Sequence, residues 1–266
     1  MTFTFRENFE KFDDIGFEGV NAEAGPKTGV KADVKANINA NMNEVKTRIL
    51  ADKLTVPHFS GHISRPRLDR LLKRSLEQVG AVLVTGRAGT GKTSIAANFA
   101  RQYERKVWYG VEAADADWKI FSNYLSKGIR SDLTGDLEVR DLEVREFVEK
   151  LLSEPRGPNT PRLIVLDDIH HVFDTKWFQE FFAATLQTIS PAIHLIFLSR
   201  SKPSLPLWRL RSKQVLTVID EKIIAFDEAE TAAYCEKAGI SPAESAKFYA
   251  ESFGRIGKLK TLVQAV

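Results

Sequence analysis

The sequence predicts an α/β fold in which a mostly parallel five-stranded sheet lies between two layers of helices. Residues 81–85, 163–168 and 194–200 each contain a short apolar run of the kind found in strands that are buried on both faces of a parallel sheet. Helical patterns separate these runs, as expected for parallel strands joined by crossover helices. From residue 226 onward the pattern is helical only, which predicts a small C-terminal helical subdomain.

The domain boundaries follow from changes in composition along the chain. Residues 1–45 are rich in Gly, Asn, Lys and Ala after a phenylalanine-containing start, and we expect a flexible N-terminal arm. The alternative is a partner-binding arm anchored by Phe5, Phe9 and Phe12. We expect the α/β core at residues 46–225 and a helical lid subdomain at 226–266. The expected strands cover residues 81–85, 106–111, 163–168, 194–200 and part of 215–225.

The overall composition is that of a globular protein with one or two domains. The 266 residues are 43% hydrophobic and 27% charged, and the net charge of +3 neither demands nor excludes nucleic acid. Cys235 is the single cysteine, so an intramolecular disulfide is impossible, and we expect it buried in a helix. No apolar run approaches the roughly 18 residues of a membrane span. The acidic, aromatic first residues are unlike a signal peptide, so a cytoplasmic location is expected.

Residues 86–93 match the pattern G-x-x-x-x-G-K-[ST] between an expected strand and a helical pattern at 94–102. In this context the glycine-rich backbone and the helix N-terminus can bind the phosphates of ATP or ADP. Lys92 is expected to contact the β- and γ-phosphates, and the Thr93 hydroxyl to bind Mg²⁺. The predicted nucleotide-binding residues are Gly86, Arg87, Ala88, Gly89, Thr90, Gly91, Lys92, Thr93 and Ser94.

A second motif, Asp167-Asp168, ends the apolar run at 163–166. Open α/β sheets bind their ligands at the carboxyl ends of strands, where these two carboxylates are expected. Asp167 fits the role of holding Mg²⁺, directly or through water, and Asp168 fits a carboxylate that orients or deprotonates the attacking water. The alternative is an Asp-Asp turn that merely ends a strand.

Arg200 follows the apolar run at 194–198 and is the third candidate catalytic residue, beside Lys92 and Asp168. Its guanidinium could reach a γ-phosphate at the same sheet edge; the alternative is a surface ion pair. His170 and His171 are adjacent in sequence and are expected to point to different faces, one of them making a structural hydrogen bond.

Three further patterns predict local structure. Asp115 and Asp117 are expected to cap a helix, with metal binding as the alternative. The tandem DLEVR at 136–145 is expected to form a charged surface helix that leads to Leu152. Residues 156–162 are expected to form a loop, and 173–189 a single helix.

The motifs together resemble the ATPase module of STAND-class signalling NTPases. The runs GRAGTGKTS, LIVLDDIHHV, LIFLSRSKPSLPLWRLR and FDEAE are most similar to the large ATP-binding LuxR-type regulators typified by the bacterial maltose-regulon activator, over residues 53–258. The resemblance implies a P-loop NTPase that ADP keeps closed and that ATP plus an inducer opens for self-association. It places Lys92, Thr93, Asp167, Asp168 and Arg200 on the family's phosphate, magnesium, acidic and sensor positions.

The sequence departs from that family in two ways. Residues 254–257, Gly-Arg-Ile-Gly, stand where the family often has Gly-x-Pro near the base. The chain also ends at Val266, which leads us to expect either a fragment of a longer regulator or a free-standing module.

The predicted function is an ATP-binding signalling ATPase with slow, magnesium-dependent hydrolysis and a regulatory role. One alternative is a non-catalytic interaction protein that nucleotide stabilises and whose arm binds a protein partner. Another is a DNA-linked P-loop ATPase, although the sequence shows no helix-turn-helix signature, so direct DNA binding is not expected. Membrane association is not expected either.

Overall fold

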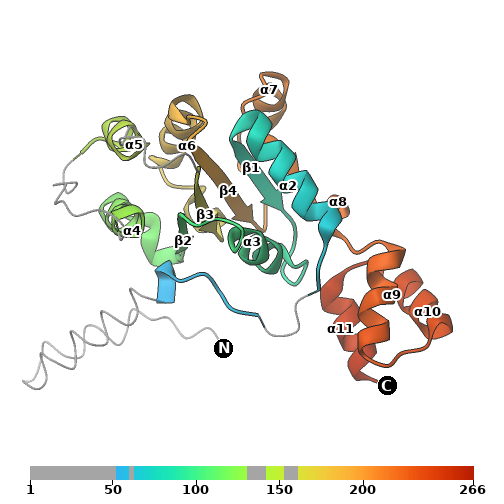
Figure 1. Cartoon of the computed structure of the whole chain (residues 1–266). Helices are drawn as coiled ribbons and strands as arrows, with labels where there is room; N and C mark the ends of the chain where they lie inside the picture. Colours follow the sequence, from blue (N-terminus) through green and yellow to red (C-terminus); the bar gives the residue numbers. More distant parts are fainter. Residues whose placement is uncertain (1–51, 60–62, 131–141, 153–160) are drawn as a thin grey trace, which may run out of the picture. The chain divides into compact units, whose positions relative to one another are not determined.

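The computed structural model of the chain describes residues 52–59, 63–130, 142–152 and 161–266 (Figure 1). The predicted N-terminal arm, most of the tandem repeat and most of the predicted loop at 156–162 lie outside the described residues. All described residues belong to one compact unit, Arg48–Val266. Within these ranges, no helix combines the length and the apolar character that crossing a membrane requires.

The sheet has five strands in the order β2-β3-β4-β1-β5, and every neighbouring pair is parallel. The strands are β1 (Ala81–Thr85), β2 (Lys106–Gly110), β3 (Arg162–Asp167), β4 (Ile193–Ser199) and β5 (Thr217–Ile219). Thr85 lies beside Ser199, and Leu166 beside Phe197, so β1, β3 and β4 end at the same sheet edge. The segments that follow these three strands are therefore brought together.

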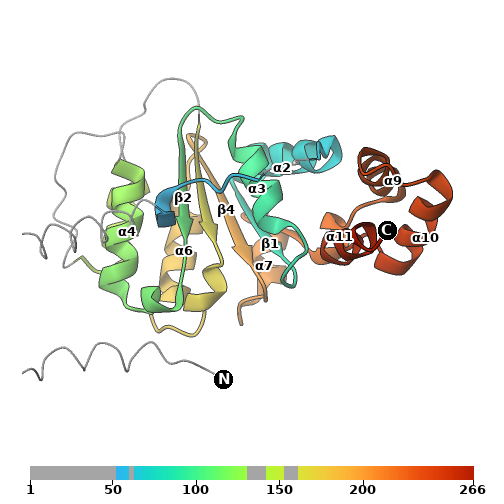
Figure 2. The ribbon, with the colours of Figure 1, turned by 90° about the horizontal axis from the view of Figure 1, so that it is seen from below.

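Helices cover both faces of the sheet, which gives the predicted three-layer α/β/α P-loop fold (Figure 2). Helices α2 (Pro66–Val79) and α3 (Lys92–Ala100) pack on one face. On the other face lie α4 (Trp118–Arg130), α5 (Val144–Leu152) and α6 (Phe178–Thr188), beside the short α7 (Leu207–Ser212).

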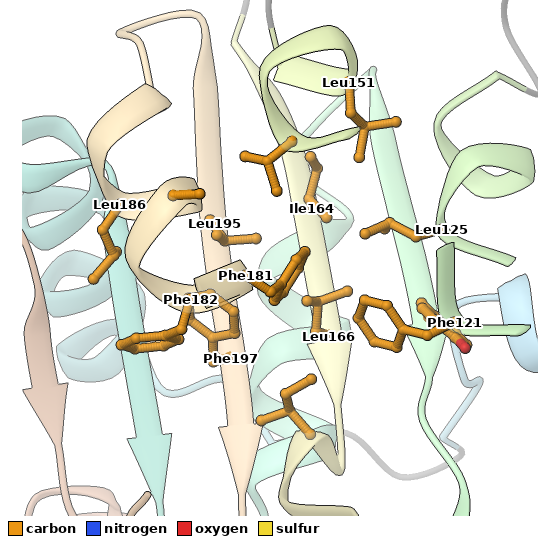
Figure 3. Packing of buried hydrophobic residues seen from close by; sticks show 14 of the residues in the cluster. Phe121, Leu125, Leu151, Ile164, Leu166, Phe181, Phe182, Leu186, Leu195 and Phe197 are labelled. Atoms are coloured by element: carbon orange, nitrogen blue, oxygen red, sulfur yellow. The ribbon is translucent and has the colours of Figure 1, made fainter. Parts of the chain in front are cut away.

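The apolar runs are continuous because each central strand is buried on both faces. In β4, Leu195 and Phe197 belong to the core under α4–α6, whereas Ile196 and Leu198 belong to the core under α2 and α3. The side chains alternate between the two faces with the period of two that a strand imposes. Figure 3 shows the first core, where Phe182 of α6 packs on Phe197 with ring centroids 4.9 Å apart.

The predicted single helix at 173–189 is wrong at its start. A 3₁₀ turn, η3 (Ile169–Val172), ends just before this range, residues 173–177 form turns, and α6 begins only at Phe178. The Thr175 hydroxyl donates a hydrogen bond to the Val172 carbonyl at 2.7 Å, which satisfies a carbonyl at the end of the turn. The helical spacing of the aromatic residues is real, but it belongs to α6 alone.

The region predicted to be a lid, called the lid below, forms the three predicted helices, α9 (Glu228–Lys237), α10 (Pro242–Ser252) and α11 (Ile256–Gln264). They follow the short α8 (Glu221–Ile224). Cys235 is fully buried in α9, as expected. Gly254 has a φ of 70°, and a Cβ there would lie 2.0 Å from the Phe226 carbonyl oxygen, so only glycine fits. Gly257, which was expected to precede the last helix, lies inside its first turn.

Replacing Thr185 by valine is expected to stabilise the fold. Thr185 lies on α6 with 3% of its surface exposed, and its hydroxyl has no hydrogen-bond partner within the described ranges. Valine has nearly the same shape and removes the desolvation cost, so the free energy of unfolding should rise by about 1 kcal/mol in urea titrations. Thr175→Val is the matched control, since it removes a hydroxyl that does make a hydrogen bond. Stabilisation of both variants alike would contradict this explanation.

His194 is expected to make the fold less stable at acidic pH. It is buried at the start of β4, and the Tyr103 hydroxyl lies 2.6 Å from its Nδ1. Burial raises the pKa of Tyr103 to about 12, so the phenol stays protonated. Its O–H donates a hydrogen bond to Nδ1 of a neutral imidazole. Burial also lowers the pKa of His194 below its usual 6.5. The folded state thus binds fewer protons than the unfolded state, and stability falls as the pH drops below about 6.5.

Urea titrations between pH 7.5 and 5 measure this effect. His194→Gln should remove part of the acid-induced loss of stability, whereas His58→Gln, at an exposed position, should leave it unchanged. An identical pH profile for the His194 variant and the unaltered chain would refute the assignment.

Candidate functional site

The phosphate-loop segment joins β1 to α3 and has the backbone conformation that its glycines predict. Gly89 and Gly91 have φ values of 76° and 91°, in the left-handed region that favours glycine. Gly86 relieves crowding instead, because a Cβ there would lie 3.1 Å from the Thr90 hydroxyl oxygen and 3.3 Å from Glu221 Cβ. Helix α3 begins at Lys92, two residues before the predicted start, so its N-terminus faces the loop.

The Lys92 side chain lies inside this loop. Its Nζ donates hydrogen bonds to the carbonyl oxygens of Gly86 at 2.5 Å and Arg87 at 3.0 Å, and only 6% of the residue is exposed. Burial lowers the pKa of Lys92, although the nearby carboxylates of Asp168 and Asp167 oppose that shift. A bound phosphate would therefore offer this ammonium group charged acceptors in place of two neutral carbonyls.

Thr93 and Asp167 meet where α3 begins and β3 ends. The Thr93 hydroxyl donates to Asp167 Oδ1 at 3.4 Å, and Asp167 is 8% exposed. Burial, reinforced by the charge of Asp168, raises the pKa of Asp167 to about 6. A carboxylate and a hydroxyl are oxygen ligands of the kind that Mg²⁺ prefers, and a cation would favour the charged form of the carboxylate. The two side chains thus fit the predicted magnesium site.

Asp168 and Arg200 also meet at this edge. An Arg200 NH2 group donates to Asp168 Oδ2 at 3.3 Å, and the two side chains are 52% and 33% exposed. Arg200 therefore does form a partly exposed ion pair, as the alternative interpretation held, but its partner is the candidate catalytic carboxylate. Asp168 has a φ of 53°, which is uncommon for a residue other than glycine, and such conformations occur preferentially at functional sites.

The two histidines lie together, which corrects the expectation that they point to different faces. Their rings stack with centroids 4.4 Å apart, because both belong to the tight turn η3. His170 Nδ1 lies 3.6 Å from Asp168 Oδ1. The Nδ1 atom of His170 is buried and makes no hydrogen bond to any described residue. The pKa of His170 is lowered mainly by burial and to a smaller extent by the neighbouring His171. A neutral imidazole therefore lies beside the Asp168 carboxylate.

Glu221 is the residue near the loop that the sequence did not single out. It accepts hydrogen bonds from both the main-chain N–H and the guanidinium of Arg87, from a position 134 residues further along the chain. No local sequence pattern predicts this pair. Glu221 follows β5 and Arg87 follows β1, and the two residues meet because β5 lies beside β1 in the sheet. Phosphate contact by Arg87 stays a prediction; in the structure Glu221 engages this residue.

The lid also approaches the loop. The Gly257 N–H donates to the Gly89 carbonyl at 3.1 Å, and a Cβ on Gly91 would lie 3.3 Å from Ile256 Cγ2. An open cleft of about 510 Å³ lies nearby, but none of Lys92, Asp167 and Arg200 lines it. Its walls come from the loop, the start of α8 and the lid, through Arg87, Asp220, Glu221, Lys222, Ala225, Phe253 and Arg255.

Asp115 and Asp117 act as caps, as the primary interpretation of the sequence held. Fully buried Asp115 accepts from the Glu112 N–H and pairs with Lys53 Nζ at 3.0 Å. Asp117 accepts from the Lys119 N–H at the start of α4 at 2.8 Å. Across the described ranges, no group of three or more His, Cys, Asp or Glu side chains has the geometry of a metal site.

Comparisons with known proteins place these observations in a family. A family model described as "AAA ATPase domain" matches residues 65–198, just over half of the chain. The HTH-type transcriptional regulator MalT of Vibrio cholerae is 29% identical over 191 residues, which cover 68% of this chain and 21% of that protein. MalT of Vibrio parahaemolyticus is 27% identical with the same coverage. The chain thus spans about a fifth of the length of these relatives.

Two solved structures resemble this chain in fold, but both have TM-scores below 0.5. The Walker-type ATPase of Pyrococcus abyssi has a TM-score of 0.49 at 13% identity, covering 76% of this chain and 67% of that one. The Orc1 protein of Aeropyrum pernix, solved in complex with DNA, has a TM-score of 0.46 at 19% identity, covering 78% and 60%. The assignment therefore rests on the sheet topology, the loop and the family match. The chain belongs to the AAA ATPase domain family, and its ATPase module is similar to that of MalT-type regulators.

Proposed function

We propose that this chain is a nucleotide-controlled regulatory switch that binds ATP or ADP with Mg²⁺ and hydrolyses ATP slowly. One observation carries the proposal. The ammonium group of Lys92 lies inside the phosphate loop while the Thr93 hydroxyl bonds to Asp167 at 3.4 Å across the sheet edge. A cation-binding pair beside a phosphate-binding loop is the arrangement that nucleoside triphosphate chemistry requires.

Each residue then has a role that its position supports. Lys92 would exchange the carbonyls of Gly86 and Arg87 for phosphate oxygens. Thr93 and Asp167 would hold Mg²⁺, which would supply charge neutralisation at the phosphates. Arg200 would exchange Asp168 for the γ-phosphate, which would free Asp168 Oδ2 to accept a proton from the water. That water would attack the γ-phosphorus while the bond to the ADP leaving group breaks.

The switching part of the proposal concerns the lid. The hydrogen bond from Gly257 to the Gly89 carbonyl ties the first turn of α11 to the loop that would hold the phosphates. A change of nucleotide there can shift the lid, provided that the two nucleotides interact differently with its two positions. ADP is proposed to keep the module closed and ATP to favour self-association. The regulatory role is supported by similarity to proteins named as transcriptional regulators, of which this chain spans a fifth.

The nucleotide retained by the purified chain tests the proposal. Native mass spectrometry is expected to show bound ADP, and calorimetry after its removal should show magnesium-dependent binding of both ADP and ATP. If the folded chain retains no nucleotide and calorimetry detects no binding of either one, the proposal is wrong. Binding without any turnover over hours would instead favour a non-catalytic, nucleotide-stabilised interaction protein.

A further inference from the structure

The contact between Arg87 and Glu221 joins the phosphate loop to the segment that leads into the lid. Glu221 Oε1 lies 2.7 Å from an Arg87 NH2 group, and its Oε2 accepts from the Arg87 main-chain N–H at 3.1 Å. The carboxylate thus binds the side chain and the backbone of one loop residue at once. Hydrogen bonds to charged groups with such fixed, two-point geometry are stronger and more directional than ordinary surface ion pairs.

Local structure holds Glu221 in this place. It is the first residue of α8, and the Asp220 side chain caps that helix by accepting from the N–H groups of Lys222 and Ile223. Packing is close, since a Cβ on Gly86 would lie 3.3 Å from Glu221 Cβ. The Arg87 guanidinium lowers the pKa of Glu221 to about 2, so the carboxylate is charged at neutral pH.

The segment after Glu221 is held in turn by two arginines at the start of α2. Arg65 donates to the carbonyls of Ile224 and Ala225, and Arg67 donates to those of Ile223 and Ala225. Both guanidinium groups also bind a carboxylate oxygen of Glu230, which lies in the first turn of the lid helix α9. Charged side chains therefore hold both ends of α8: Arg87 binds its first residue, and Arg65 and Arg67 bind its last carbonyls and Glu230 of the lid.

We propose that Glu221 is a positioning residue that acts through Arg87 to hold the phosphate loop in its binding conformation and links the loop to the start of the lid. This inference rests on the proposed nucleotide-binding function. In this role the side chain of Glu221 would act on the loop and would not contact a phosphate itself. It fixes the N–H of Arg87, next to the Gly86 carbonyl that accepts from Lys92.

A double-mutant cycle on Mg-ADP binding tests the positioning role. Arg87→Gln and Glu221→Gln should each weaken binding by about tenfold, the scale of one charge-assisted hydrogen bond lost from a partly exposed pair. Both changes remove the ion pair between the two side chains, and only the Glu221 change also affects the bond from the Arg87 main-chain N–H. The double variant should therefore bind no more weakly than Glu221→Gln alone, about tenfold rather than about a hundredfold. Lys222→Gln is the matched control: its side chain is exposed and lines the same cleft, so binding should be unchanged.

A second readout separates positioning from a general loss of stability. Hydrogen exchange at residues 223–230 should speed up in Glu221→Gln but not in Lys222→Gln, while urea midpoints stay similar. If the unaltered chain binds ADP and the Glu221 and Arg87 variants bind it equally well, or if their effects multiply, the positioning role is overturned and the proposed function stands. If the unaltered chain binds no nucleotide, the proposed function fails first and the positioning role falls with it.

Discussion

Replacing Lys92 by alanine is expected to weaken the binding of both Mg-ADP and Mg-ATP by roughly a hundredfold. Hydrogen bonds to charged groups contribute about 1.5–3 kcal/mol, and the ammonium group is expected to make more than one of them to phosphate oxygens. The effect is large because Lys92 is already buried inside the loop, so little side-chain entropy is lost when phosphate binds. Isothermal titration calorimetry at fixed free Mg²⁺ measures both affinities.

The control for this change is Lys73→Ala, which removes the same charge from an exposed position on α2. Its affinities should match those of the unaltered chain. Lys92→Ala also removes a donor from the carbonyls of Gly86 and Arg87, so a urea titration must show that the variant still folds. A folded Lys92 variant with unchanged affinity for both nucleotides would contradict the assigned phosphate loop.

The sequence was sufficient to predict the parts of this molecule that depend on local patterns. A strand buried on both faces needs a continuous apolar run, and a phosphate loop needs glycines at positions such as 89 and 91, so both are visible in the sequence. The meeting of Thr93 with Asp167 was also predictable. Parallel strands that end in polar residues at one sheet edge bring those residues together.

The features that the sequence did not predict depend on contacts between residues far apart in the chain, or on local backbone conformations that no sequence pattern encodes. Glu221 meets Arg87 only because the order of strands places β5 next to β1. Lys53 pairs with Asp115, 62 residues further along the chain. Asp115, for which metal binding was the alternative interpretation, is therefore part of a buried ion pair. The left-handed conformation of Asp168 starts a 3₁₀ turn, and the helix predicted from residue 173 therefore begins five residues later.

Replacing Asp168 by asparagine is expected to leave nucleotide binding nearly unchanged and to lower the rate of ATP hydrolysis by a factor of about 10²–10⁴, the usual contribution of a general base. Asparagine is the right replacement for two reasons. It keeps the size of the side chain while removing the proton acceptor, and it tolerates the φ of 53° at this position better than most residues do. The measurement is phosphate release under single-turnover conditions, paired with the affinity for Mg-ATP from calorimetry.

The geometry around Asp168 makes the two readouts separable. Its carboxylate pairs with Arg200 at 3.3 Å, whereas the oxygens assigned to Mg²⁺ belong to Thr93 and Asp167. Losing the Asp168 charge should therefore spare the binding of Mg-ATP and even release Arg200 toward the γ-phosphate, so the affinity for ATP should not fall. Asp174→Asn, an exposed change on the same connection, is the control and should alter neither quantity. Unaltered turnover in Asp168→Asn would show that another group accepts the proton, while a parallel loss of binding would place Asp168 in the metal site instead.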